Sequence, residues 1–490
     1  MTSKTMKRYR WILCILLCTT VSGCALGPDF HEPVVQTPEG YRTAVMPTEA
    51  ADDLRWWSLF DDPLLIDLVT EALTNNRDVR IAVSRIEQAR AALGFTRADR
   101  YPRVDVEAGV QTGNFNGFSR GSNQTTTFYL AAPLSWEIDF WGKFKRSTQA
   151  ARAELFASDF GLKAVELALV TDVVSAYNQL LDFHRRRIIS ENTLASRIES
   201  LHIIEQRFEK GIIGKLDVNQ AQIQREIAAA AIPLYERSIA QTEHGLAVLL
   251  GRLPETIQIQ KNLSGHEPPQ IPTGLPAEIL QRRPDIIQAS FLLQAQTEKI
   301  GVAQAQRLPA ISLTGALGVA STDLGTVTVE GGVWSVGGRL LGPVIDFGKN
   351  KRRVEIEEQR TKEALYQYEN IILNAFREVE DALVAIDTYR KELEAVNRQQ
   401  IAAKSANELS KERYDKGVSS YLEVLDTERA LFNAELTLSE LQQLYRNSFV
   451  SLYKALGGGW IYPDEGQITS FRRTEDHKTL LVATPVPPVQ

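Results

Sequence analysis

The sequence is poor in the residue types from which catalytic and metal sites are usually built. Its 490 residues include only three cysteines, three methionines and six histidines. The histidines show no metal-ligand spacing, and we find no P-loop, nucleophile elbow or dinucleotide fingerprint. We therefore expect neither an enzyme nor a bound metal or cofactor. The scarcity of methionine and cysteine also argues against metal export.

Excess positive charge and long apolar runs are absent as well. The formal net charge is −6, and removal of positions 1–23, which hold four basic residues and no acidic one, gives about −10. Nucleic acid is excluded as a partner, because phosphate binding needs clustered Lys and Arg. After residue 24 no apolar stretch approaches the roughly 20 residues of a membrane-spanning helix. If the rest of the chain crosses a membrane, it does so as β-strands.

The first residues have the form of an export signal. A basic start precedes the apolar run Trp11–Val21, which ends in Ser22-Gly23-Cys24. A cysteine directly after Ser-Gly resembles the lipobox of bacterial lipoproteins, which implies cleavage before Cys24 and attachment of diacylglycerol and palmitate to it. Ala25 then implies transfer to the outer membrane. The alternative is an ordinary signal peptide with a chance cysteine.

The remainder of the chain repeats itself once. Pro102 returns as Pro309 and Asp139 returns as Asp346, both 207 residues later. After one extra residue, Trp141, the offset becomes 206. A constant offset with a single slip indicates two copies of one structural unit.

Each copy contains a predicted β-hairpin. Apolar and polar residues alternate in two runs within about 104–139 and in two more within about 310–346. Each run has about ten residues, the length of a tilted transmembrane strand. Soluble hairpins with one wet face are the alternative. In a membrane, four strands cannot close a barrel, which needs about eight, so several chains must share one.

Long helices follow the hairpins, at about 145–208 and about 349–414. The second has no Pro or Gly, and both keep apolar residues at heptad spacing. A helix of roughly 65 residues extends about 100 Å. A plain coiled coil is the alternative interpretation of this pattern. Shorter helices are predicted at about 63–100, 216–250, 277–307 and 421–456.

The turns and the C-terminal helix carry a family resemblance. Arg413-Tyr-Asp-Lys-Gly417 is followed by Tyr421-Leu-Glu-Val-Leu-Asp426, and residues 452–460 read Leu-Tyr-Lys-Ala-Leu-Gly-Gly-Gly-Trp. With the repeat, the lipobox and Gly27-Pro28-Asp29-Phe30, they resemble the TolC-like outer membrane efflux proteins, in their lipoprotein (OprM/NodT-like) branch. The resemblance implies an α+β membrane protein of two tandem helix–hairpin–helix repeats. It also implies a homotrimer whose 12-stranded β-barrel is continuous with a long periplasmic α-barrel.

What the resemblance implies for function is an exit duct. The trimer would passively conduct drugs or other small toxic compounds from an inner-membrane RND-type transporter and a periplasmic adaptor protein across the outer membrane lipid. A duct for type I protein secretion and a non-conducting structural coiled-coil lipoprotein are the alternatives. The expected divisions are a signal peptide 1–23, an acylated strap 24–62, a first unit 63–254, a linker 255–276, a second unit 277–460 and a disordered tail 464–490.

The resemblance also places a closed pore entrance at the turns. Glu423 and Asp426 match carboxylates that narrow it, and three copies would form rings that favour cations. Ser420 and Glu423 also form a capping-box pattern, so Glu423 has a helix cap as its alternative role. Asp217 and Tyr414 match a pair that ties neighbouring hairpins. The alternative for Asp217 is that it is a solvated acidic residue in the first turn of its helix. The residues expected to meet the adaptor are Gly211, Ile212, Ile213, Gly417, Val418 and Ser419.

Overall fold

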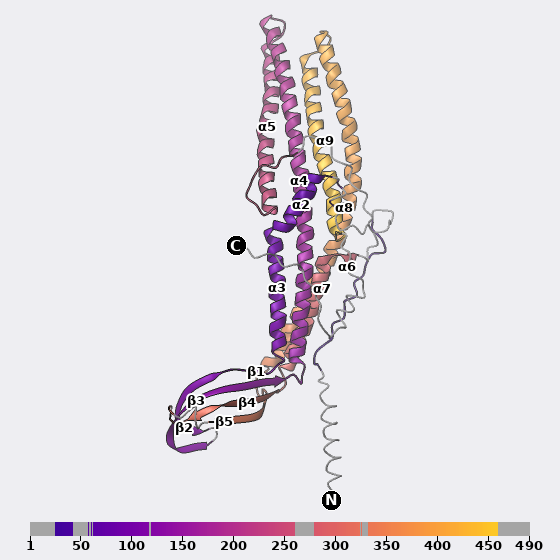
Figure 1. The fold of residues 1–490 in the computed structure, drawn as a ribbon. Helices are drawn as coiled ribbons and strands as arrows, with labels where there is room; N and C mark the ends of the chain where they lie inside the picture. The colour runs from indigo at the N-terminus through magenta and orange to yellow at the C-terminus, as the bar shows by residue number, and fades with distance from the viewer. Residues whose placement is uncertain are drawn as a thin grey trace.

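The computed structural model describes residues 25–42, 57, 60, 62–116, 119–259, 279–323, 325 and 332–458. It forms an elongated molecule in which two long helical hairpins extend to one end and a β-sheet lies at the other (Figure 1). Cys24, the expected tail and most of the expected linker lie outside the described residues.

Two units follow one another with the same order of elements. The predicted class of tandem helix–hairpin–helix repeats is therefore confirmed. The first unit contains α2 (Pro63–Asn75), α3 (Arg77–Ala98), β1 (Arg103–Val104), β2 (Glu107–Asn116), β3 (Ser119–Ile138), α4 (Lys143–Glu209) and α5 (Lys215–Leu249). The second contains α6 (Ile279–Arg282), α7 (Pro284–Ala305), β4 (Ala310–Ser321), β5 (Gly332–Leu341), α8 (Lys349–Asp415) and α9 (Tyr421–Ala455).

The leading helix of each unit is broken, so the prediction of continuous helices at 63–100 and 277–307 was wrong. In the first unit Asn76 leaves the helical conformation, and its Oδ1 accepts hydrogen bonds from the backbone N–H of Asp78 (2.7 Å) and Val79 (3.2 Å). Asparagine is a favoured N-cap, so a new helix starts there. In the second unit Pro284 starts α7 and forces an extended conformation on the residue before it.

The strands form one antiparallel sheet that joins the two units. β3 pairs with β1 and β2 on one side and with β4 on the other, and β5 pairs with β4. Within the described residues β2 and β5 each pair with one strand only, so the sheet has two open edges. The register places Leu130, Leu317 and Trp334 on one face, where all three are exposed. The predicted alternation thus produces an uncovered apolar face.

An aspartate turns the chain from strand to helix in each unit. Asp139 accepts backbone hydrogen bonds from Phe144 (3.0 Å) and Lys145 (2.7 Å) at the start of α4. Asp346 does the same at the start of α8, where a carboxylate is favoured by the helix dipole. The extra residue of the first unit, Trp141, donates its indole N–H to the carbonyl of Pro309 at 2.8 Å. The residue inserted in the first unit therefore makes a contact with the second unit.

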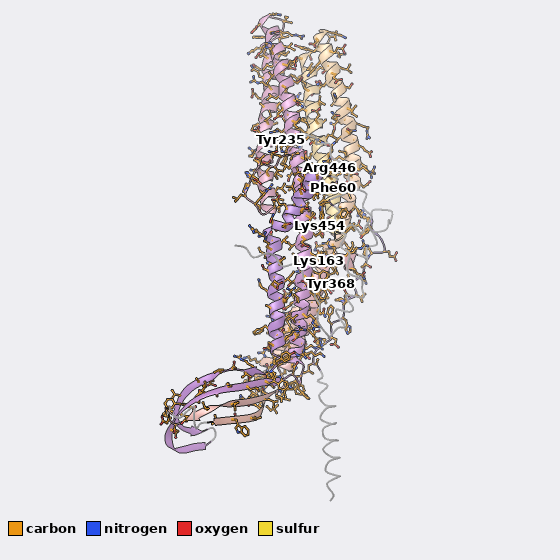
Figure 2. The ribbon with its side chains drawn as sticks, in the orientation of Figure 1. Phe60, Lys163, Tyr235, Tyr368, Arg446 and Lys454 are labelled. Atoms are coloured by element: carbon orange, nitrogen blue, oxygen red, sulfur yellow. The ribbon has the colours of Figure 1, made fainter. Side chains whose placement is uncertain are left out.

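The long helices pack through the predicted heptad positions. In α8, Ile372 and Val379 are fully buried, as are Val173 and Leu180 in α4. Figure 2 shows Tyr368, a member of the same cluster as Ile372, in the helical part of the molecule. None of the described helices has a stretch apolar enough to span a membrane.

Candidate functional site at the turns of the hairpins

Each hairpin ends in the same tight turn. Gly211 and Gly417 adopt φ angles of +70° and +74°, the left-handed conformation that glycine tolerates best. The next backbone N–H, of Ile212 or Val418, donates to a carbonyl five residues back, at 3.0 Å in both turns. Ile212 and Val418 are exposed at the tip, whereas Ile213 and Ser419 are half-buried.

The two expected pore carboxylates lie at the start of α9, each beside an arginine. Glu423 accepts a hydrogen bond from Nε of Arg413 at 3.1 Å. The capping-box alternative is not formed, since Ser420 makes no side-chain capping bond within the described part of the chain. Asp426 is 77% exposed and lies 3.4 Å from Arg429. Exposed pairs of this kind contribute at most about 1 kcal/mol, so neither carboxylate is fixed in place.

No hydrogen bond joins Asp217 to Tyr414 among the described residues. Both lie close to Tyr421: the ring of Tyr414 is 5.4 Å away, and Asp217 adds to the effects of burial and Glu428 that raise the pKa of Tyr421. Among the described residues the hydroxyl of Tyr414 is buried without a hydrogen-bonding partner. The pore and adaptor roles of these residues stay predictions.

The contacts that join the hairpins at this end were missed by sequence reasoning. Arg207 donates to Asp415 at 3.1 Å and lies over the ring of Tyr414 at 4.6 Å. Arg207 and Arg413 are equivalent in the repeat. Arg413 nevertheless pairs with a residue of its own hairpin, whereas Arg207 pairs with a residue of the other hairpin. An apolar cluster lies between the hairpins as well: Leu201, Ile204, Val218, Ala221, Tyr421, Val424 and Leu425.

The segment that follows Cys24 is held by one buried arginine. Arg146, 4% exposed, donates from Nε to the carbonyl of Leu26 (2.9 Å) and from Nη2 to Asp29 (2.8 Å). Its Nη1 donates to Glu298 of α7 at 2.8 Å. Gly27, with φ +99°, lies so close to α7 that an added Cβ would be 2.5 Å from the Cα of Gly301. We call this arrangement the strap clamp.

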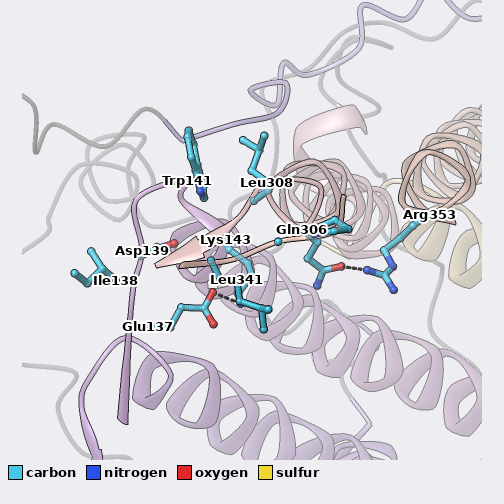
Figure 3. Close-up of a pocket in the computed structure, with 13 residues that line it drawn as sticks. Glu137, Ile138, Asp139, Trp141, Lys143, Gln306, Leu308, Leu341 and Arg353 are labelled. Carbon is cyan, nitrogen blue, oxygen red and sulfur yellow. Dashed lines mark hydrogen bonds and ion pairs between the residues drawn. The ribbon is translucent and has the colours of Figure 1, made fainter. Parts of the chain in front are cut away.

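A pocket of about 450 Å³ lies where β3 leads into α4 (Figure 3). Four of its polar side chains form two pairs, Lys143 with Glu137 at 2.5 Å and Arg353 with Gln306 at 2.8 Å, and Asp139 is bonded to the start of α4. No group of three metal-binding side chains occurs anywhere in the described residues. The turns, rather than this pocket, therefore hold the candidate site.

Comparison with known proteins agrees with this geometry. The family model of outer membrane efflux proteins matches residues 68–252 and 275–458. Over 91–92% of its length, the chain is 34% identical to the probable outer membrane lipoprotein SilC of Salmonella typhimurium and 33% identical to the cation efflux protein CusC of Escherichia coli K12, covering 99% and 98% of them. It is 34% identical to the solvent efflux pump outer membrane protein SrpC of Pseudomonas putida, over 90% of the chain and 96% of SrpC. The structure of the outer-membrane channel OprN has a TM-score of 0.81 at 30% identity, over 89% of this chain and 100% of that one. The chain belongs to the outer membrane efflux protein family.

Proposed function

We propose that three copies of this chain form the outer membrane exit duct of a tripartite efflux pump. The observation that carries the proposal is the sheet, which has two open edges and an exposed apolar face. Open edges are not tolerated in lipid, because unpaired backbone groups there cost several kcal/mol each. Pairing β5 of one copy with β2 of the next removes every edge, and three copies of four long strands give a 12-stranded barrel.

The helical part supplies the periplasmic half of the duct. α4 and α8 have 67 residues each and therefore extend about 100 Å. Six hairpins side by side would enclose one channel whose entrance is at the turns. Glu423 and Asp426 would then line that entrance, with their charge partly offset by Arg413 and Arg429.

The partners follow from this placement. The exposed turn residues Ile212 and Val418 would meet a periplasmic adaptor, and an inner-membrane RND-type transporter would supply the energy. Acyl chains on Cys24 would anchor each copy, with the strap clamp holding the segment behind it. We infer a passive conduit without catalysis or cofactor.

We assign the selection of the cargo to the inner-membrane transporter rather than to the duct. The chain is about equally similar to CusC, named for cation efflux, and to SrpC, named for solvent efflux. One architecture that serves both supports a conduit that passes what its transporter selects. Drugs or other small toxic compounds remain our inference for the cargo, and the expectation against metal export stays a prediction.

The open edges offer a test of assembly. Cysteines placed in β2 at Val110 and in β5 at Val336 should be joined between copies by a short bifunctional thiol reagent, which gives covalent trimers on denaturing gels. Each single-cysteine variant is the matched control and should remain a monomer. Monomers alone from the double variant would contradict closure between copies and favour a non-conducting coiled-coil lipoprotein. A genetic neighbour of the ABC-exporter type, with a secreted protein substrate, would favour the type I secretion duct.

A further inference from the structure

The two hairpins of the chain meet along α4 and α9, and this seam is not uniform (Figure 1). It is apolar near the turns, around Tyr421, and apolar again farther down, where Val450 and Tyr453 pack on α4. Between these two clusters it contains ionised side chains: Arg197 of α4 is 2% exposed and Glu428 of α9 is 6% exposed. Burial of charge is costly, so these residues call for an explanation.

Arg197 reaches from the first hairpin into the second. Its Nη1 donates to the backbone carbonyl of Gln224 in α5 at 2.6 Å. Its guanidinium lies over the ring of Phe432 in α9, 5.0 Å from the ring centre, one helical turn from Glu428. Arg197 therefore touches its own hairpin through a hydrogen bond and the other hairpin through a cation–π contact.

Lys411 connects the hairpins in the opposite direction, from the second hairpin to the first. Its Nζ lies 2.9 Å from Oε1 of Glu428, inside the second hairpin, and donates to Oγ of Ser196 in the first hairpin at 3.3 Å. Arg197 and Lys411 thus approach one carboxylate from the two sides of the seam. The contacts of Arg197 and Lys411 therefore involve all four helices of the two hairpins, α4, α5, α8 and α9.

The charges are only partly satisfied. Within the described residues, Nε and Nη2 of Arg197 and Oε2 of Glu428 are buried without hydrogen-bonding partners. Burial lowers the pKa of Arg197, and Glu428 is the main group that opposes this effect. The two side chains therefore attract each other across the seam without forming a direct ion pair.

We propose that Arg197, Lys411 and Glu428 form a partly buried electrostatic latch that sets how easily the two hairpins separate, independently of the contacts at the turns. The proposal rests on the proposed function, since it concerns the opening of the same entrance. The cross-hairpin pair at the turns, Arg207 with Asp415, is partly exposed and is screened by salt. Arg197 and Glu428 are shielded from solvent, whereas the side chain of Lys411 is 35% exposed, so salt should weaken the latch less than it weakens the pair at the turns. Because its ions are incompletely paired, their hydration on separation offsets part of the lost attraction, and the latch is able to open.

The test measures the separation of the hairpins directly. Spin labels at Ile212→Cys and Val418→Cys report the distance between the two turns of the purified full chain in detergent. Glu428→Gln keeps the shape but leaves Arg197 and Lys411 as two cations without a carboxylate between them, so the distance should become longer and broader. Glu412→Gln, which removes an exposed carboxylate paired on its own helix, is the matched control and should leave the distance unchanged.

An apolar variant separates a latch from a merely structural role. In R197M/K411M/E428L none of the three latch charges remains, and the distance should return to that of the parent protein. An unchanged distance in Glu428→Gln overturns the latch, as does a triple variant as open as Glu428→Gln. If Glu428→Gln does not assemble, Arg197→Lys keeps the charge but loses the planar fork, and it must then lengthen the distance. The readout needs no ion current, so failure of the latch and failure of the duct are distinguishable.

Discussion

Arg146→Met should release the start of the segment 25–42, around Leu26 and Asp29, from the helices while leaving the hairpins in place. Arg146 of the first unit joins the start of this segment, through Leu26 and Asp29, to Glu298 of the second unit. Methionine keeps the apolar stem but removes every donor of the guanidinium. Glu298, 5% exposed, is then left as a buried carboxylate without its partner.

The expected magnitude is large. Removing one partner of a buried ion pair costs about 3–5 kcal/mol, which is a roughly 150- to 5000-fold larger population of the open form. Burial raises the pKa of Glu298 and Arg146 opposes this, so the variant raises that pKa further. Stability that depends on a raised carboxyl pKa is present at low pH and is lost as the pH rises through the folded-state pKa. The deficit of the variant should therefore be smaller in mildly acidic buffer than at neutral pH.

Hydrogen exchange of residues 25–42, followed by mass spectrometry, measures this opening. Exchange should accelerate in Arg146→Met and accelerate less in R146M/E298Q, which also removes the stranded carboxylate. Arg90→Met is the matched control, since Arg90 pairs with Glu87 on an exposed face of α3, away from the strap clamp. Exchange as slow in Arg146→Met as in the parent protein would refute the strap clamp.

Three further experiments test other parts of the structure. Ile372→Ala deletes a fully buried heptad side chain and should cost about 2–5 kcal/mol in the free energy of unfolding, whereas Leu373→Ala, on the exposed face, should leave the denaturant midpoint nearly unchanged. Gly417→Ala places a Cβ at φ +74° and should cost about 1 kcal/mol by the same measurement; a neutral result would contradict the turn geometry. Asp426→Asn should lower the cation preference of reconstituted channels, read as a shift in reversal potential under a salt gradient, and Arg429→Gln should raise it. Equal reversal potentials in both variants would count against a pore position for Asp426.

The architecture could be predicted from the sequence because it depends on periodicity. Heptad spacing identified the positions at which Ile372 and Val379 are buried, and the repeat offset marked Trp141 as an insertion. The break at Asn76 was missed because apolar spacing continues on both sides of it. A favoured N-cap residue was the available signal, and it was outweighed by the apparent continuity of the helix.

The contacts of the candidate site and of the strap clamp could not be predicted, because they join distant parts of the chain. Arg146 and Gly27 are 119 residues apart, and Arg207 and Asp415 are 208 apart. The repeat made Arg207 and Arg413 equivalent, but it did not indicate that one pairs across the hairpins and the other within its own. Similarly, the capping-box pattern at Ser420 was a valid local signal, but Arg413 takes the carboxylate of Glu423 instead.

Planar-bilayer recording of the purified full-length protein tests the exit duct most directly. Reconstituted protein should produce discrete conductance steps, and Asp426→Ala, which removes charge at the proposed entrance, should still conduct with a changed step size. Bilayers that remain silent with both the parent protein and Asp426→Ala, at protein concentrations where trimers are present, would contradict a channel.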